Sequence, residues 1–374
     1  MNWRRGNFRE GPQFRLMRLL ALLTLVVACR EPTPYHIGIV LNPDGARGAA
    51  VAIETINAHG GIHGHRLELV DLGGGASTRA KLALETADSL ASDSRVLAVV
   101  GHTNSSASIA ASQVYNARHV VQIAPTSTSP LYGQAGPYSF RLVASDDFQG
   151  VFLADQALNR AQRPRVAVVY VNDDYGRPLR RVVAARLQSA GLAPVFDAPY
   201  AEDDAYSNQG ELVMALAQTR PDLLLWIGRA TDYGDIVPSL KRALPRLEII
   251  ASDGFGSSEL TTDSLHRFDG VRYVRLVDLA RNDSSLRQLQ ARYVRDGFGE
   301  LSDQAVLSYD AVTLLAEAIR NAGPKREAIR AWLADMVTSE RSVMGLSGPI
   351  VFASSSSRAP QYFLERVHAG ARKP

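Results

Sequence analysis

The sequence has a single cysteine, Cys29, among its 374 residues, so no disulfide can form within the chain. After the N-terminal region, no segment approaches the roughly 20 consecutive apolar residues that a membrane-spanning helix needs. These two absences exclude a disulfide-stapled scaffold and a polytopic membrane protein. With 46% apolar and 21% charged residues, the composition is that of a globular protein, and the length suffices for two lobes.

The chain also lacks a basic surplus outside its first 28 residues. Those 28 residues carry five arginines and one acid, so the whole-chain totals of 41 basic and 38 acidic residues fall to 36 and 37 without them. The formal charge of +3 therefore belongs to the leader, and we expect no nucleic-acid partner.

Residues 1–28 resemble a signal peptide, because arginines precede the short apolar run LLALLTLVVA. The run ends in the sequence VVAC, which is similar to a bacterial lipobox. We therefore predict that Cys29 is lipidated, that residues 29–34 form a tether, and that the protein is anchored to a membrane in the periplasm or at the cell surface. The alternative for Cys29 is a buried thiol. Translation from Met17 would leave a shorter leader.

Strands and helices are expected to alternate from residue 35 onward. Runs such as VAVVYV and LLLWI are continuously apolar, as parallel strands covered on both faces should be. This pattern predicts an α/β fold, with too many strands for one sheet and hence two doubly wound parallel-sheet lobes. The expected strands are 35–41, 66–72, 95–100, 120–124, 165–171, 194–198, 222–227 and 247–251. The expected helices are 46–58, 78–91, 106–117, 148–161, 177–190, 208–219, 233–243, 284–296 and 309–321. Residues 348–352 and 361–367 flank a serine-rich turn and predict a hairpin.

Polar residues follow five of the predicted strands, where ligands bind in open parallel sheets. Ser105 begins a helix, whose free N–H groups favour a carboxylate, and Asp253 is suited to an ammonium group. The alternative for each serine or threonine is a helix cap or a turn.

Several stretches resemble the leucine/isoleucine/valine-binding proteins of ABC importers, which are type I periplasmic binding proteins. They are GHTNSSASIAASQVYNARHVVQIAPTSTSP, INAHGGIHGHRLELV, YVNDDYG and GPIVFASSSSRAPQYFLERV, and together they place the resemblance over nearly all of residues 35–370. The resemblance implies a protein that captures a small polar ligand, an amino acid or a related compound, and delivers it to ABC permease subunits. It implies neither a cofactor nor catalysis.

Ligand contacts follow from the same resemblance. Ser105 matches the residue that holds the ligand carboxylate, and Asp253 matches the acid that pairs with the ammonium group. Thr126 matches a backbone-carbonyl contact to the ammonium group, Thr128 a contact to both ends of the ligand, and Tyr175 an aromatic that closes from the other lobe.

The chain departs from the family in two places. Arg229 falls where many relatives have tyrosine, and arginine favours a planar anion unless it pairs with a protein acid instead. The first loop, IVLNPDGARGAA, is shortened and lacks the tyrosine that usually covers the ligand side chain. Leucine-like specificity is therefore not implied.

The architecture expected on this basis has three crossovers that form a hinge, near residues 141–146, 270–278 and 344–348. Residues 35–143 and 275–344 would form the N-terminal lobe, and residues 144–274 and 345–374 the C-terminal lobe.

The sequence also bears on other classes of function. An enzyme is disfavoured, because no G-x-S-x-G elbow and no partnered nucleophile is present, although His102 flanks the predicted pocket. A metal site at His59, His63 and His65 is disfavoured, because these histidines fall in a glycine-rich turn. A ligand-sensing or partner-recruiting lipoprotein of the same fold stays open as the alternative.

Overall fold

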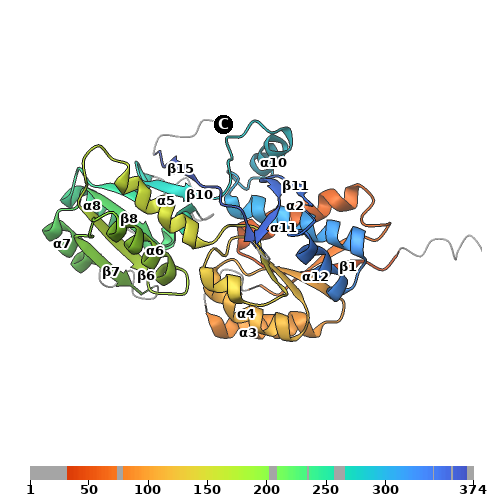
Figure 1. Cartoon of the computed structure of the whole chain (residues 1–374). Helices are drawn as coiled ribbons and strands as arrows, with labels where there is room; N and C mark the ends of the chain where they lie inside the picture. Colours follow the sequence, from red (N-terminus) through yellow and green to blue (C-terminus); the bar gives the residue numbers. More distant parts are fainter. Residues whose placement is uncertain are drawn as a thin grey trace, which may run out of the picture.

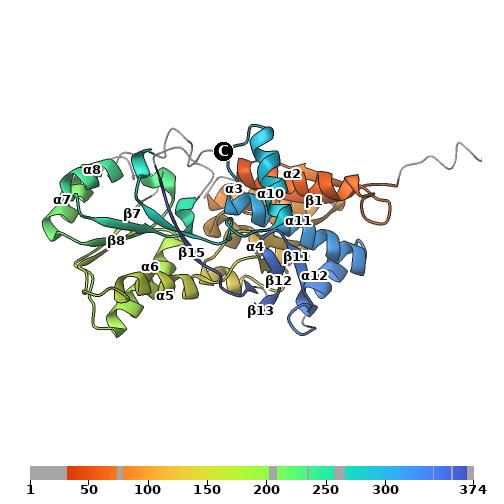
Figure 2. The same cartoon turned by 90° about the horizontal axis from the view of Figure 1, so that it is seen from above.

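The computed structural model describes residues 32–73, 79–201, 209–233, 236–256, 266–339, 341–354 and 357–368. These residues form two α/β lobes that lie side by side, and three segments of the chain pass between them (Figures 1 and 2). The predicted fold class is confirmed.

The first lobe is built on a seven-stranded sheet of order β13-β14-β5-β4-β3-β1-β2. Its core strands are parallel, and only β13 runs antiparallel to its neighbour β14. The strands are β1 (Tyr35–Val40), β2 (Leu67–Asp71), β3 (Val96–Gly101), β4 (Val121–Ala124), β5 (Ser139–Arg141), β13 (Phe352–Ser354) and β14 (Ser357–Arg358). A short separate hairpin joins β11 (Val343–Gly345) to β12 (Gly348–Ile350).

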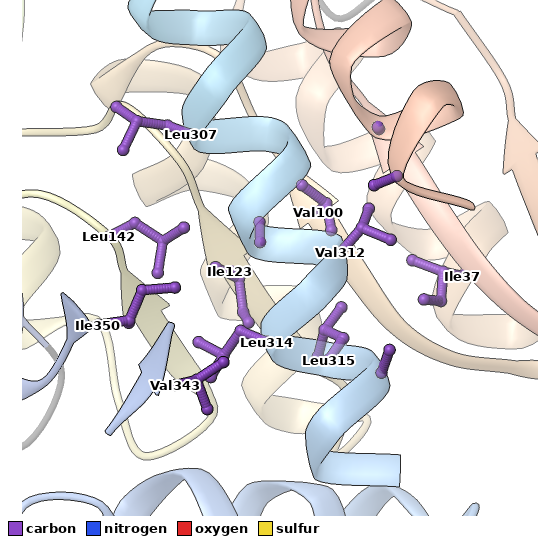
Figure 3. Packing of buried hydrophobic residues seen from close by; sticks show 14 of the residues in the cluster. Ile37, Val100, Ile123, Leu142, Leu307, Val312, Leu314, Leu315, Val343 and Ile350 are labelled. Carbon is purple, nitrogen blue, oxygen red and sulfur yellow. The ribbon is translucent and has the colours of Figure 1, made fainter. Parts of the chain in front are cut away.

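Helices cover both faces of this sheet, because successive residues of its strands point to opposite sides. Ile37 and Ile39 of β1 join a core with the helices α2 (Pro43–Ala58), α10 (Ser284–Arg295), α11 (Asp303–Ala322) and α12 (Arg326–Asp335). Val40 faces the other side, towards α3 (Ala80–Ser92) and α4 (Ser105–Ala117). Figure 3 shows Val312 and Leu315 of α11 packed against Ile37 and Val100 of the sheet.

The second lobe repeats this arrangement on a six-stranded sheet of order β15-β10-β9-β8-β6-β7, in which only β15 is antiparallel to its neighbour. The strands are β6 (Val166–Val171), β7 (Phe196–Tyr200), β8 (Leu223–Ile227), β9 (Glu248–Ala251), β10 (Arg272–Arg275) and β15 (Phe363–Arg366). The helices α5 (Asp146–Leu158) and α6 (Gly176–Ser189) cover one face, and α7 (Gln209–Thr219) and α8 (Ile236–Ala243) cover the other. Short 3-10 turns occur at Pro130–Gln134, Ala230–Tyr233, Asp253–Gly256 and His266–Phe268.

The chain passes from the first sheet to the second between β5 and α5, and returns between β10 and α10. It crosses a third time between β14 and β15, over residues 359–362. The predicted crossover at 344–348 is therefore too early, and residues 345–358 do not belong to the second lobe. The physical reason is packing: the Phe352 ring is buried in the first core, with its centroid 5.8 Å from that of Phe140.

The predicted hairpin between 348–352 and 361–367 is wrong for the same reason. The serine-rich turn does join two antiparallel strands, but these are β13 and β14, and β15 lies in the other sheet. Helix α11 begins at Asp303, six residues before the predicted start at 309, and α12 was not predicted. The leader, Cys29 and residues 369–374 lie outside the described residues.

Candidate functional site

A pocket lies between the two lobes, at the carboxyl ends of the parallel strands of both sheets. In the first sheet β2 and β3 lie on opposite sides of β1, and in the second sheet β7 and β8 lie on opposite sides of β6. The strand order changes direction at these points, and open α/β sheets bind ligands at such topological switch points. The pocket encloses about 760 Å³ of space, part of which is open to solvent. Its walls are formed by Asn42, Thr103, Asn104, Ser105, Thr126, Tyr175, Arg229, Asp253, Gly254, Gly256, Leu276, Asp303 and Gln304.

Ser105 lies on the first-lobe side of the pocket, at the first residue of α4. The preceding residue, Asn104, caps the helix by accepting a hydrogen bond from the Ala107 N–H at 3.0 Å. Ser105 Oγ accepts a hydrogen bond from the Ser129 N–H at 3.3 Å, which leaves its own proton available to a ligand in the pocket. The first N–H groups of a helix have no partner within it, so this end of the pocket suits an anion.

The two predicted threonines have different environments. Thr126 lines the pocket, and its hydroxyl donates to the Thr103 carbonyl at 2.7 Å. Thr128 is not among the lining residues: it is buried, and its hydroxyl donates to the Asp146 carboxylate at 3.0 Å. The expected contact of Thr128 with both ends of a ligand therefore does not match its position, because the hydroxyl is used at the hinge.

Asp253 and Tyr175 form the facing wall, on the second lobe. Tyr175 Oη donates to Asp253 Oδ1 at 2.6 Å and lies 2.8 Å from Ser252 Oγ. The Gln149 carboxamide donates to the same Asp253 oxygen at 2.9 Å. Burial raises the pKa of the Asp253 carboxyl, while hydrogen bonds from Tyr175 and Gln149 lower it. Burial beside Asp253 also raises the pKa of Tyr175, which keeps its hydroxyl neutral.

Arg229 lines the pocket, but its charge is matched by a protein acid. Its Nη2 lies 2.7 Å from Asp173 Oδ2, and both side chains are mostly buried. The guanidinium carbon lies 6.0 Å from the centroid of the Tyr175 ring. The second of the two alternatives for Arg229, an ion pair within the protein, is thus present, although the side chain still borders the pocket.

Several pocket residues were missed by reasoning from sequence, among them Asn42, Leu276, Asp303 and Gln304. Asn42 follows β1 and caps α2, and its Nδ2 donates to Gln304 Oε1 at the start of α11. Asparagine is a favoured N-cap residue and proline a favoured first residue of a helix, so Asn42-Pro43 after a predicted strand could have indicated this helix start. Gln304 was hidden because α11 was predicted to begin later in the chain.

The histidines have structural partners. His102 is buried beneath the pocket wall, and burial lowers its pKa to about 3, so it is neutral. His59 Nδ1, His63 Nε2 and His65 Nδ1 each hydrogen-bond a different backbone carbonyl, at 2.7, 3.0 and 2.8 Å. Among the residues that the structure describes, no cluster of histidine, cysteine and acidic side chains is arranged to hold a metal ion.

Comparison with known proteins decides the family. The family model described as "Periplasmic binding protein" matches residues 38–364. The chain is a periplasmic binding protein. It is 30% identical over 294 residues to an amino acid binding protein of Pseudomonas aeruginosa, covering 77% of this chain and 76% of that protein. It is 28% identical to a Leu/Ile/Val-binding protein homolog of Brucella melitensis, covering 74% and 73%.

Solved structures agree on the fold. The branched-chain amino acid substrate-binding protein LivJ of Streptococcus pneumoniae, in complex with isoleucine, has a TM-score of 0.79 at 22% identity and covers 90% of this chain and 97% of that one. A solute-binding protein of Rhodopseudomonas palustris in complex with benzoate has a TM-score of 0.77 at 15% identity, with coverages of 90% and 94%. This binding protein is therefore of type I and is not an enzyme. Within the described residues, no helix has the length and apolar character to cross a bilayer.

Proposed function

We propose that this binding protein captures an α-amino acid or a closely related amine between its lobes and delivers it to an ABC importer. One observation carries the proposal: a helix N-terminus with Ser105 on one lobe and the Asp253 carboxylate on the other line the same pocket. An α-amino acid presents a carboxylate and an ammonium group on one carbon, and these match the two walls. The amino acid binding relatives support the same ligand class.

The charge balance of the pocket supports a ligand with no net charge. Two of the charged wall residues have partners within the protein: Arg229 pairs with Asp173, and Asp303 pairs with Arg275, whose guanidinium also contacts Glu365. Asp253 is then the carboxylate left for a ligand cation, and the start of α4 offers its N–H groups to the ligand carboxylate.

The remaining wall residues restrict which ligand side chains fit the pocket. Asn42 and Gln304 place two linked carboxamides there, and Leu276 is the one aliphatic side chain among the lining residues. An acidic ligand side chain would have to displace Asp173 from Arg229, and a wholly aliphatic one would leave the carboxamides desolvated. We infer a ligand with an uncharged, hydrogen-bonding side chain, such as an amide or hydroxyl.

Anchoring through Cys29 is part of the proposal and is supported by the leader sequence. The described chain begins at residue 32, shortly before β1, on the side of the first lobe that faces away from the second lobe (Figure 1). A sensing lipoprotein of the same fold is the alternative. Permease and ATPase genes beside the gene for this chain would favour import.

The test is direct identification of the ligand. Small molecules released from purified protein by denaturation are identified by mass spectrometry, and calorimetric titration then compares glutamine, threonine, isoleucine, glutamate and benzoate. Tight binding of glutamine or threonine supports the proposal. Binding of benzoate but of no amino acid would overturn it and leave a carboxylate-binding protein of the same fold.

A further inference from the structure

One side chain joins two carboxylates, of which Asp146 is buried behind the pocket and Asp253 lines it. Asp146 and Gln149 lie in the first turn of α5, at the hinge, and neither is exposed to solvent. The Gln149 Nε2 atom donates to Asp146 Oδ1 at 2.8 Å and to Asp253 Oδ1 at 2.9 Å. Asp253 lines the pocket, so the bridge connects the ligand wall to the hinge.

The orientation of the Gln149 carboxamide is fixed by a third hydrogen bond. Its Oε1 accepts from the backbone N–H of Asp253 at 3.0 Å, so the NH₂ group must face the two carboxylates. A carboxamide nitrogen only donates, so each carboxylate receives one of its two hydrogens. Gln149 therefore sets both the position of Asp253 and its separation from Asp146.

Nothing in the described surroundings neutralises this pair by a direct ion pair. The Arg141 guanidinium lowers the pKa of Asp146 through its charge, but its hydrogen bonds go to the carbonyls of Thr128 and Ser129, at 3.0 and 2.7 Å, and to Ser357 Oγ at 2.7 Å. The other titratable groups that face the pair add negative charge or are neutral phenols: Asp147, Asp303, Tyr175 and Tyr362. Two carboxylates that share one carboxamide donor and are shielded from water favour holding one proton between them.

The hydrogen-bond partners indicate which carboxyl holds that proton. Asp253 Oδ1 receives two hydrogen bonds, from Tyr175 and Gln149, which favour its ionised form. Asp146 also receives two, from Gln149 at Oδ1 and from Thr128 at Oδ2, but the Thr128 hydroxyl can rotate and accept a hydrogen bond when Asp146 is protonated. Burial and the charge of Asp253 raise the pKa of Asp146 well above its usual value.

We propose that Gln149 is a positioning residue that ties Asp253 to Asp146, so that capture of an ammonium group at Asp253 releases a proton from Asp146. A cation in the pocket compensates the charge of Asp253 and lets Asp146 ionise as well. This inference rests on the proposed amine ligand. Its consequence is that affinity for amines rises with pH above the range in which an exposed aspartate titrates, about pH 4.

The linked proton is measurable by calorimetry. Titration of glutamine, threonine and isoleucine in buffers of different ionisation enthalpy, at several pH values between about 5 and 8, gives the number of protons released per ligand. We expect a fraction of a proton, up to one, from the wild-type protein. Asp146→Asn mimics the protonated carboxyl, and we expect it to bind the same ligand with no release and a flatter pH profile. Asp155→Asn, on the same helix but paired with Arg186, is the matched control and should behave as wild type.

Two further measurements distinguish a failure of this inference from a failure of the proposed function. Gln149→Leu should weaken binding of the amino acid probe at least tenfold, while its circular dichroism stays unchanged. Carbon-13 NMR of labelled aspartates in ligand-free protein should show one carboxyl, lost in Asp146→Asn, that titrates above the normal range. If no probe binds, the proposed function fails, and the NMR titration still decides whether the pair holds a proton. Normal titration of Asp146, or binding without proton release, would overturn this inference.

Discussion

Arg275 on β10 reaches across the hinge to Asp303 at the start of α11, with Nη2 only 2.6 Å from Oδ1. The same carboxylate accepts a hydrogen bond from the Leu276 N–H at 2.7 Å, just after the second crossover begins. This ion pair therefore fixes the crossover strand of one lobe to a helix of the other, directly beside the pocket.

Removing the acid from that pair should destabilise the protein. Both side chains are more than nine-tenths buried, so Asp303→Ala leaves a buried guanidinium whose remaining acidic partner among the described residues is Glu365. We expect a loss of about 3 kcal/mol in the free energy of unfolding, measured by chemical denaturation. Asp335→Ala breaks the exposed pair with Arg341 and should cost less than about 1 kcal/mol. Equal losses in the two variants would contradict a structural role for the buried pair.

Asp253 should dominate the affinity for amines. Asp253→Asn keeps the size of the side chain but removes the charge that faces the ligand, at a cost of about 2–5 kcal/mol, or more than tenfold in Kd. Calorimetry of an amino acid and of its 2-hydroxy analogue measures the effect, which should be confined to the amine. Asp174→Asn, in a neighbouring loop and paired with Arg177, serves as the control. An unchanged Kd for the amino acid would exclude Asp253 as the ammonium partner.

Gln304 should set the selectivity for the ligand side chain. Gln304→Leu replaces a carboxamide linked to Asn42 with an aliphatic group of similar size. We expect the Kd ratio between threonine or glutamine and isoleucine to move at least fivefold towards isoleucine, because a lost neutral hydrogen bond is worth about 1 kcal/mol. The same calorimetric panel measures this ratio. A uniform change for all three ligands would place Gln304 outside the side-chain subsite.

Ser129 should favour the closed arrangement of the lobes. Its hydroxyl donates to the Asp174 carbonyl at 2.6 Å, which joins the loop after β4 to the loop after β6. Ser129→Ala should weaken binding of every ligand by about fivefold, the equivalent of one net hydrogen bond of about 1 kcal/mol. Small-angle X-ray scattering of the free protein should then show a larger radius of gyration. Altered selectivity instead would indicate a direct ligand contact.

Cys29 should decide where the protein is found in the cell. Two or three acyl chains hold a protein firmly to a membrane, whereas one is marginal. Cys29→Ala should therefore move the protein from the membrane fraction to the soluble fraction, as followed by immunoblotting. Persistence of the variant in the pellet would argue against a lipid anchor at this position.

Much of the fold could be predicted from the sequence, because buried parallel strands are long apolar runs, as in β6 and β8. The positions of Ser105 and Asp253 could be predicted for the same reason, since each lies within four residues of the end of such a strand. The strand pairing of residues 345–366 could not be predicted from the sequence. Strands β12 to β15 are only two to four residues long, and their pairing depends on tertiary contacts such as that of Phe352 with Phe140.

The hinge side of the site was missed for a different reason. Helix α5 was predicted to begin at residue 148, so Asp146 fell outside it and its alignment with Gln149, one turn later, was not seen. The Arg229–Asp173 pair was foreseen only as an alternative, because the partner of an arginine depends on how two loops meet in space.

The third crossover also affects the order in which the protein is able to fold. β15 is the last strand of the described chain, yet it covers the edge of β10 in the second sheet, with Arg272 opposite Arg366 and Arg275 opposite Phe363. Until those residues are available, β10 has an uncovered edge, and uncovered edges promote aggregation. If the chain becomes available for folding from its N-terminus, strands β1 to β5 of the first sheet can pair early. The second sheet is completed only when β15 is added. Loss of the final dozen residues would thus damage a sheet whose other strands lie about 90 or more positions upstream in the sequence.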